Sequence, residues 1–200
     1  MKEAIHHLRR NDAVLAEIID RVGDYRIEFR EPGFETLVKS IVYQQLSGRV
    51  ASIIFERLVK AAGGELTPAS VLKLRPERMR KLGLSKQKTE YIRDLARHTR
   101  DRRVVFEELG GLTDAEVIER LTEVKGIGVW TVHMFLMFAL RRTDVLPVGD
   151  LGIRNAIKAA YGLKESPTPA EVEGMGVRWR PYCTVASWYL WRSLEPNANL

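Results

Sequence analysis

The chain has 200 residues, of which 45% are hydrophobic, a size and composition that suit one globular domain or two small lobes sharing a core. Lys and Arg outnumber Asp and Glu by 32 to 26, and the resulting charge of +6 favours a polyanionic partner. Cys183 is the only cysteine, which excludes a disulfide framework, a zinc cluster of cysteines and a four-cysteine iron–sulfur site.

Helical spacing of apolar residues, bounded by capping residues, glycine and proline, predicts a succession of short helices. The predicted helices are 14–22, 34–43, 47–61, 68–74, 76–82, 85–100, 113–124, 129–140, 151–160, 169–175 and 180–194. Thr67, Ser85 and Thr113 are the expected N-caps, and Glu116 completes a capping box with Thr113. No convincing run of alternating residues predicts a strand, so the expected fold class is all-α.

Neither the start of the chain nor its longest apolar run predicts targeting to a membrane. The start, MKEAIHHLRRND, has no apolar core, so we expect no signal peptide. We expect this terminus to be mobile and assign no role to His6 or His7. The longest apolar stretch, 129–140, is too short to span a bilayer, which predicts a soluble protein with no membrane partner.

A basic segment runs from residue 73 to residue 103, with twelve Lys and Arg against four Asp and Glu. Two interpretations remain open: solvated helix faces, or a surface that faces phosphates. Ser85, Lys86 and Lys88 begin a helix inside this segment, and they are candidate phosphate contacts. An ordinary capped surface helix is the alternative for these three residues.

Residues 121–132, LTEVKGIGVWTV, join two predicted helices through a tight link that contains Gly126 and Gly128. Two glycines one residue apart allow a sharp turn and the close approach of another surface. The helix that follows opens with N–H groups and the positive end of its dipole, which suit a phosphate. Asp150 lies directly before a later helix, where an aspartate is a common N-cap and its charged form is favoured.

The hairpin resembles a helix-hairpin-helix motif, and with LPVGD at 146–150 it is similar to the helix-hairpin-helix (HhH-GPD) DNA glycosylase superfamily. IVYQQLS at 41–47 and WRP at 179–181, followed by Trp191, resemble its DNA-3-methyladenine glycosylase II, or AlkA-like, branch. The resemblance runs from about residue 34 to residue 194. It implies one unit over 1–200 in the compact form, which has no additional N-terminal β-rich domain. The implied lobes are approximately 38–139 and 1–37 plus 140–200, with the active cleft between them.

The resemblance also implies a role for each motif residue. Asp150 would be the catalytic carboxylate, and Trp130 stands where bifunctional relatives carry a Schiff-base lysine. The implied base pocket contains Trp130, Trp191, Tyr43 and Met134, while Trp188 and Tyr189 are core aromatics by default. The implied DNA wedge is Gln45, with Gln44 near the opposite strand. The implied phosphate contacts are Gly126, Gly128 and Lys125, and the carbonyls of Thr122, Val124 and Ile127 would hold a Na⁺ or K⁺ ion.

The implied activity is that of a monofunctional glycosylase that flips alkylated purines, of the 3-methyladenine and 7-methylguanine type, out of duplex DNA and hydrolyses their N-glycosidic bond. It would act as a monomer on duplex DNA containing alkylated bases, with no required cofactor. It would be cytoplasmic at the nucleoid in a prokaryote, or nuclear in a eukaryote. The alternatives are a non-catalytic DNA-binding or damage-recognition module and a bifunctional glycosylase-lyase.

Overall fold

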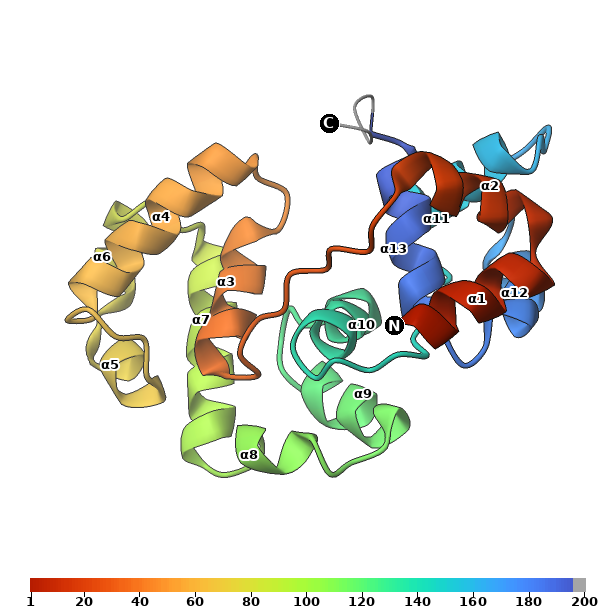
Figure 1. The fold of residues 1–200 in the computed structure, drawn as a ribbon. Helices are drawn as coiled ribbons and strands as arrows, with labels where there is room; N and C mark the ends of the chain where they lie inside the picture. Colours follow the sequence, from red (N-terminus) through yellow and green to blue (C-terminus); the bar gives the residue numbers. More distant parts are fainter. Residues whose placement is uncertain (196–200) are drawn as a thin grey trace. The chain divides into compact units, whose positions relative to one another are not determined.

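The computed structural model describes residues 1–195, and within this range the regular secondary structure consists of helices, without a strand (Figure 1). The prediction of an all-α fold is confirmed. The chain forms two compact units: unit 1 contains Met1–Phe29 and the chain from Leu136 onward, and unit 2 is Arg30–Phe135. None of the helices within residues 1–195 has both the length and the apolar character needed to cross a bilayer.

The helices of unit 2 are short and are joined by tight turns. They are α3 (Phe34–Tyr43), α4 (Gly48–Ala61), α5 (Pro68–Lys73), α6 (Pro76–Lys81), α7 (Lys86–Arg100), α8 (Phe106–Leu109), α9 (Asp114–Thr122) and α10 (Val129–Phe138), whose last residues belong to unit 1. The central helix is α7, which packs against α3, α5 and α6 (Figure 1). It begins at the predicted cap, because the Ser85 hydroxyl accepts the N–H of Lys88 at 3.1 Å.

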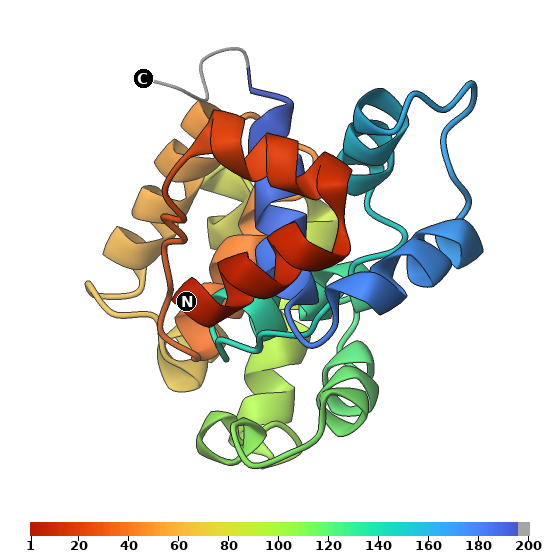
Figure 2. The same cartoon turned by 45° about the vertical axis from the view of Figure 1, so that its right-hand side comes forward.

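Unit 1 is built around its last helix. Its elements are α1 (Lys2–Asn11), α2 (Ala13–Val22), α11 (Leu151–Ala160), α12 (Pro169–Gly176), the 3₁₀ turn η1 (Val177–Trp179) and α13 (Cys183–Ser193). Helix α13 packs against α1, α2 and α11 (Figure 2). Residues 183–190 of this helix are all buried. Trp188 and Tyr189 are among them, so the prediction that they are core aromatics is confirmed.

The predicted helix boundaries agree with the structure to within two residues except at α13. That helix begins at Cys183 instead of Arg180, because Arg180 precedes a proline and has an extended ψ of 139°. The prediction of a mobile N-terminus is wrong: residues 2–11 form α1, which is held by the buried side chains of Ala4 and Leu8. Helix α8 and the turn η1 were not predicted, because three or four residues are too few to show a helical period.

Candidate active site

Asp150 occupies the N-cap of α11, as predicted. Its Oδ1 accepts the backbone N–H of Ile153 at 2.8 Å and the indole N–H of Trp191 at 2.8 Å. Asp150 is 9% exposed, so these bonds lie in a largely dry environment. The structure therefore brings together the predicted catalytic carboxylate and a predicted pocket aromatic that is 41 positions away in the chain.

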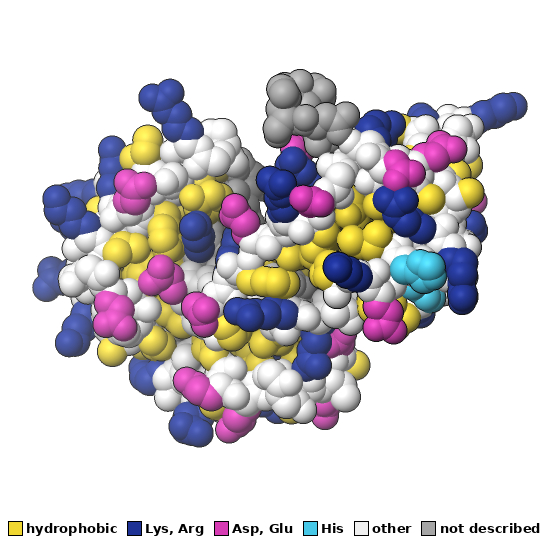
Figure 3. Space-filling model, in the orientation of Figure 1, with side chains coloured by type: hydrophobic (Ala, Val, Ile, Leu, Met, Phe, Trp, Pro, Cys, Tyr) yellow, Lys and Arg dark blue, Asp and Glu magenta, His cyan; other side chains and the backbone are white. Residues whose placement is uncertain are grey.

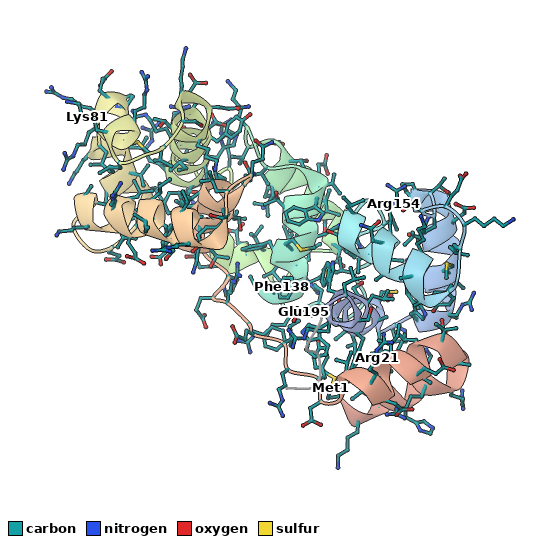
Figure 4. The ribbon with its side chains drawn as sticks, turned by 90° about the horizontal axis from the view of Figure 1, so that it is seen from above. Met1, Arg21, Lys81, Phe138, Arg154 and Glu195 are labelled. Atoms are coloured by element: carbon teal, nitrogen blue, oxygen red, sulfur yellow. The ribbon has the colours of Figure 1, made fainter. Side chains whose placement is uncertain are left out.

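Phe138 and Gly152, which no motif singled out, lie next to the contact between Asp150 and Trp191. Phe138, in the last turn of α10 and labelled in Figure 4, stacks on Trp191 with ring centroids 6.1 Å apart. A Cβ at Gly152 would lie 3.0 Å from Asp150 Oδ1 and 3.0 Å from Trp191 Cδ1. The one signal for this in the sequence is a glycine in the first turn of a predicted helix, where alanine is the more stable residue.

The segment before Asp150 is tied to the same helix that carries Trp191. The Thr184 hydroxyl, near the start of α13, donates to the carbonyl of Arg142 at 2.7 Å and accepts the N–H of Val145 at 3.1 Å. Because α13 also contains Trp191, one helix supports both the acid and its aromatic partner.

The hairpin between α9 and α10 is held by side chains of α7. The N–H of Lys125 donates to Asp94 Oδ2 at 3.0 Å. Gly126 has a φ of 83°, and a Cβ there would lie 2.0 Å from the Tyr91 ring, so both backbone conformation and space require glycine. Nothing lies within 4 Å of the corresponding Cβ position at Gly128. The fold therefore requires the first glycine, while the second borders open space.

Asp94 is a buried anionic anchor for this hairpin. Burial acts to raise the pKa of Asp94, but hydrogen bonds from the Lys125 N–H and from Arg97 outweigh it and hold the pKa below its ordinary value. The Arg97 bond is 3.1 Å long. A charged acceptor makes the bond to the hairpin backbone stronger than one between neutral groups.

Residues 43–46 form the tight turn between α3 and α4, where the wedge was predicted. Gln45 is exposed and has a φ of 58°, a left-handed conformation that is strained for a residue with a side chain. The N–H of Leu46 donates to the Tyr43 carbonyl at 3.3 Å. The side-chain amide of Gln44 donates to the carbonyl of Gly126 at 2.9 Å, so the turn is joined directly to the hairpin.

Lys88 has a structural role that the prediction of a phosphate contact did not include. Its ammonium donates to the carbonyls of Val42 at 2.7 Å and Gln44 at 2.6 Å, at the C-terminal end of α3. Partial burial lowers the pKa of Lys88. Of the other two candidates, Ser85 caps α7 and Lys86 is exposed.

The basic segment 73–103 divides into internal and outward-facing side chains. Arg93 donates to the carbonyl of Leu74 at 2.7 Å and so supports the link between α5 and α6. Arg80 and Lys86 help to line a hollow of about 250 Å³ beside α6 and α7. Figure 3 shows further Lys and Arg side chains standing out from unit 2, and Lys81 points outward in Figure 4. The outward-facing members are compatible with both interpretations, whereas neither interpretation predicted the internal role of Arg93.

The remaining predicted pocket residues lie in unit 2. Trp130 is 52% exposed in the first turn of α10, and Met134 follows one turn later on the same face of the helix. Tyr43 is half-buried at the end of α3, where the Lys39 ammonium lies 5.7 Å from its ring centroid. Trp130 and Met134 are thus brought to one helix face, whereas Trp191 belongs to the Asp150 site of unit 1.

The hairpin between α9 and α10 contains the carbonyls of Thr122, Val124 and Ile127, which were predicted to hold a Na⁺ or K⁺ ion. Val124 O accepts the N–H of Ile127 at 3.1 Å, and a carbonyl oxygen has a second lone pair. Together with Thr122, these residues offer neutral oxygen ligands. Among residues 1–195, no group of three or more His, Cys, Asp or Glu side chains is placed to hold a metal ion.

Most of the chain is similar to proteins of one family. Residues 38–181 match the family described as HhH-GPD superfamily base excision DNA repair protein. DNA-3-methyladenine glycosylase 1 of Schizosaccharomyces pombe is 36% identical over 194 residues, which cover 94% of this chain and 85% of that protein.

Two solved structures extend the similarity to the fold. A DNA-3-methyladenine glycosidase from Bacillus halodurans has a TM-score of 0.84 and 39% identity, and the match covers 96% of this chain and 87% of that one. The 3-methyladenine DNA glycosylase of Schizosaccharomyces pombe, in complex with abasic DNA, has a TM-score of 0.85 and 36% identity, and the match covers 95% of both chains. The chain therefore belongs to the HhH-GPD superfamily of base excision DNA repair proteins.

Proposed function

We propose that this protein is a monofunctional DNA glycosylase that acts as a monomer on duplex DNA and hydrolyses the N-glycosidic bond of alkylated purines, of the 3-methyladenine and 7-methylguanine type. Its family and the names of its relatives support this activity. The observation that carries the proposal is the hydrogen bond between Asp150 and Trp191, because it combines a fixed carboxylate with an aromatic wall.

The carboxylate meets the electrostatic demand of the reaction. When the bond between C1′ and the purine nitrogen breaks, its electron pair leaves with the base and positive charge develops on the sugar. Asp150 stabilises that charge in a water-poor site, and water then adds its oxygen to C1′ and releases a proton. A cationic alkylated purine leaves as a neutral base, so the reaction needs no strong general acid.

The two tryptophans support selection of a cationic base and a monofunctional outcome. An indole face attracts a positively charged ring, which an alkylated purine supplies and an ordinary purine does not. Trp130 stands where bifunctional members of the superfamily carry lysine, and an indole cannot form a Schiff base with the sugar. We therefore expect the product to be an abasic site in an unbroken strand. A protein–DNA adduct trapped by borohydride would contradict this.

The hairpin supports binding of a DNA phosphate. The open space at Gly128 allows a phosphate to approach the backbone N–H groups at the start of α10. A Na⁺ or K⁺ ion held by the carbonyls of Thr122, Val124 and Ile127 would add positive charge beside that phosphate. No further cofactor is proposed.

The turn at residues 43–46 supports base flipping. Gln45 is exposed at the tip of a strained turn, and a side chain that enters the space left by a flipped nucleotide offsets lost stacking. Its strained backbone is the kind of feature that concentrates at functional sites.

The test is release of 3-methyladenine and 7-methylguanine from methylated DNA, measured chromatographically for the wild type and Asp150→Asn. Asparagine can cap α11 through its side-chain oxygen, so the change removes the negative charge and keeps the N-cap. We expect base release to fall about 100- to 1000-fold while binding to undamaged DNA is retained.

Asp12→Asn is the matched control, because Asp12 also caps a helix and accepts an indole N–H, from Trp179. We expect this variant to release bases at the wild-type rate per folded molecule. Equal release by the wild type and Asp150→Asn would remove Asp150 from the mechanism. Tight DNA binding by a wild type that releases no base would instead indicate a non-catalytic damage-recognition module.

A further inference from the structure

Helix α7 presents three side chains, three residues apart, to the two segments of unit 2 that are proposed to touch DNA. Lys88, Tyr91 and Asp94 lie within an arc of about 120° on the helix surface, because each residue turns by about 100°. Lys88 holds the carbonyls of Val42 and Gln44. Tyr91 and Asp94 hold the hairpin. One rigid helix therefore supports both the wedge turn and the phosphate-binding hairpin.

Gln44 joins these two segments to each other. Its backbone carbonyl is held by Lys88 at 2.6 Å, and its side-chain amide donates to the carbonyl of Gly126 at 2.9 Å. The next residue is the strained Gln45. A left-handed conformation at a residue other than glycine persists when its surroundings over-determine it, and the two bonds of Gln44 are such constraints.

We propose that Gln44 is a positioning residue that couples phosphate binding at the hairpin to insertion of Gln45 into the base stack. This rests on the proposed DNA-binding roles of the hairpin and of Gln45. When the hairpin binds a phosphate, the Gln44–Gly126 bond fixes the wedge turn relative to that phosphate. The wedge then enters the duplex without a separate ordering step, which lowers the free energy of base flipping.

The test compares Gln44→Met with Gln87→Met in single-turnover release of 7-methylguanine. Methionine keeps much of the length of glutamine without adding charge, and it cannot donate to Gly126. Gln87 is the matched control, because its amide donates to Tyr91 Oη within α7, four residues away. Each variant is assayed on two duplexes, one with the lesion paired to cytosine and one with the lesion opposite an abasic site.

We expect Gln44→Met to slow release from the paired duplex about tenfold, the order expected for one lost hydrogen bond. On the unpaired lesion the loss should be less than about threefold, because a base without a partner needs less help to leave the stack. Gln87→Met should remain close to the wild type on both. A purely structural role would slow release equally on the two duplexes.

Equal slowing on both duplexes, or no slowing on either, would overturn the proposal. Gln44→Leu repeats the test in a second uncharged side chain that lacks the donor, in case methionine perturbs folding. A wild type that releases no base from either duplex would contradict the proposed activity. That outcome is distinct from an active wild type whose Gln44 variants behave alike on the two duplexes.

Discussion

Unit 1 contains two aspartates that each cap a helix and each accept a hydrogen bond from a tryptophan. Asp12 caps α2, and it accepts the N–H of Leu15 at 3.0 Å and the indole N–H of Trp179 at 2.8 Å. Asp150 caps α11 and has the corresponding bonds from Ile153 and Trp191.

The surroundings of the two aspartates differ. The bonds of Asp12 use both of its oxygens, and Oδ2 also accepts the Tyr161 hydroxyl at 2.5 Å, while Trp179 is completely buried. At Asp150 the indole partner Trp191 is only half-buried, and the neighbouring Leu151 is 65% exposed. Asp12 therefore joins elements of the core, whereas Asp150, with the same kind of cap, lies beside an accessible surface. Local chemistry alone does not separate the structural carboxylate of Asp12 from the proposed catalytic carboxylate of Asp150.

Among the substitutions that test the difference between Asp12 and Asp150, replacement of their tryptophan partners should have the largest effect. Trp191→Phe keeps an aromatic ring but removes the donor that orients Asp150, so we expect single-turnover base release to fall about 10- to 100-fold. Trp179→Phe removes the equivalent donor from Asp12, so we expect unchanged release and a free energy of unfolding lower by about 1–3 kcal/mol. Urea denaturation measures the second effect. Loss of activity in Trp179→Phe without loss of stability would reverse the assignment.

A smaller effect is expected from Gly152→Ala. The new Cβ would press on Asp150 Oδ1 and on the Trp191 ring, so we expect base release to fall about three- to tenfold. Gly174→Ala is the matched control, because Gly174 lies in α12 of the same unit with nothing within 4 Å of its Cβ position. It should leave activity unchanged and stabilise the protein by about 0.5–1 kcal/mol. Equal activity of the two alanine variants would show that the Trp191 contact tolerates displacement.

The parts of the site that follow local rules were predictable from sequence. Asp150 was expected to cap a helix because of the capping pattern, and Gly126 was expected in a turn because glycine permits a positive φ. The helix limits of unit 2 follow from the same rules, since Thr67, Ser85 and Thr113 each cap the helix predicted for them.

The residues that support these motifs were not predictable, because their contacts depend on packing between distant segments. Asp94 is 31 positions from the hairpin N–H it accepts, and the Trp179 indole that reaches Asp12 is 167 positions away. The terminus that contains His6 and His7 was expected to be mobile, because α1 is highly charged and only a few of its residues are apolar. Ala4 and Leu8 bury one face of that helix and bring Asp12 to the core.

The last expected difference between the two aspartates concerns how the free energy of unfolding changes at alkaline pH. This change is gradual. Burial, reinforced by the hydrogen bond to Asp12, raises the pKa of Tyr161 well above its ordinary value, and burial raises the pKa of Tyr25 to about 12. In the unfolded chain a tyrosine ionises near pH 10. Above that pH the unfolded state loses protons that the folded state keeps, so the stability present below about pH 10 falls as pH rises.

Urea midpoints measured from about pH 8 to about pH 11 would show this decline. Tyr161→Phe removes one of the contributing groups and should flatten the curve, whereas Asp150→Asn removes no tyrosine and should leave its slope unchanged. If Tyr161→Phe kept the wild-type slope, the Asp12–Tyr161 bond would not be part of the folded state at high pH. The distinction between the two aspartates would then rest on burial alone.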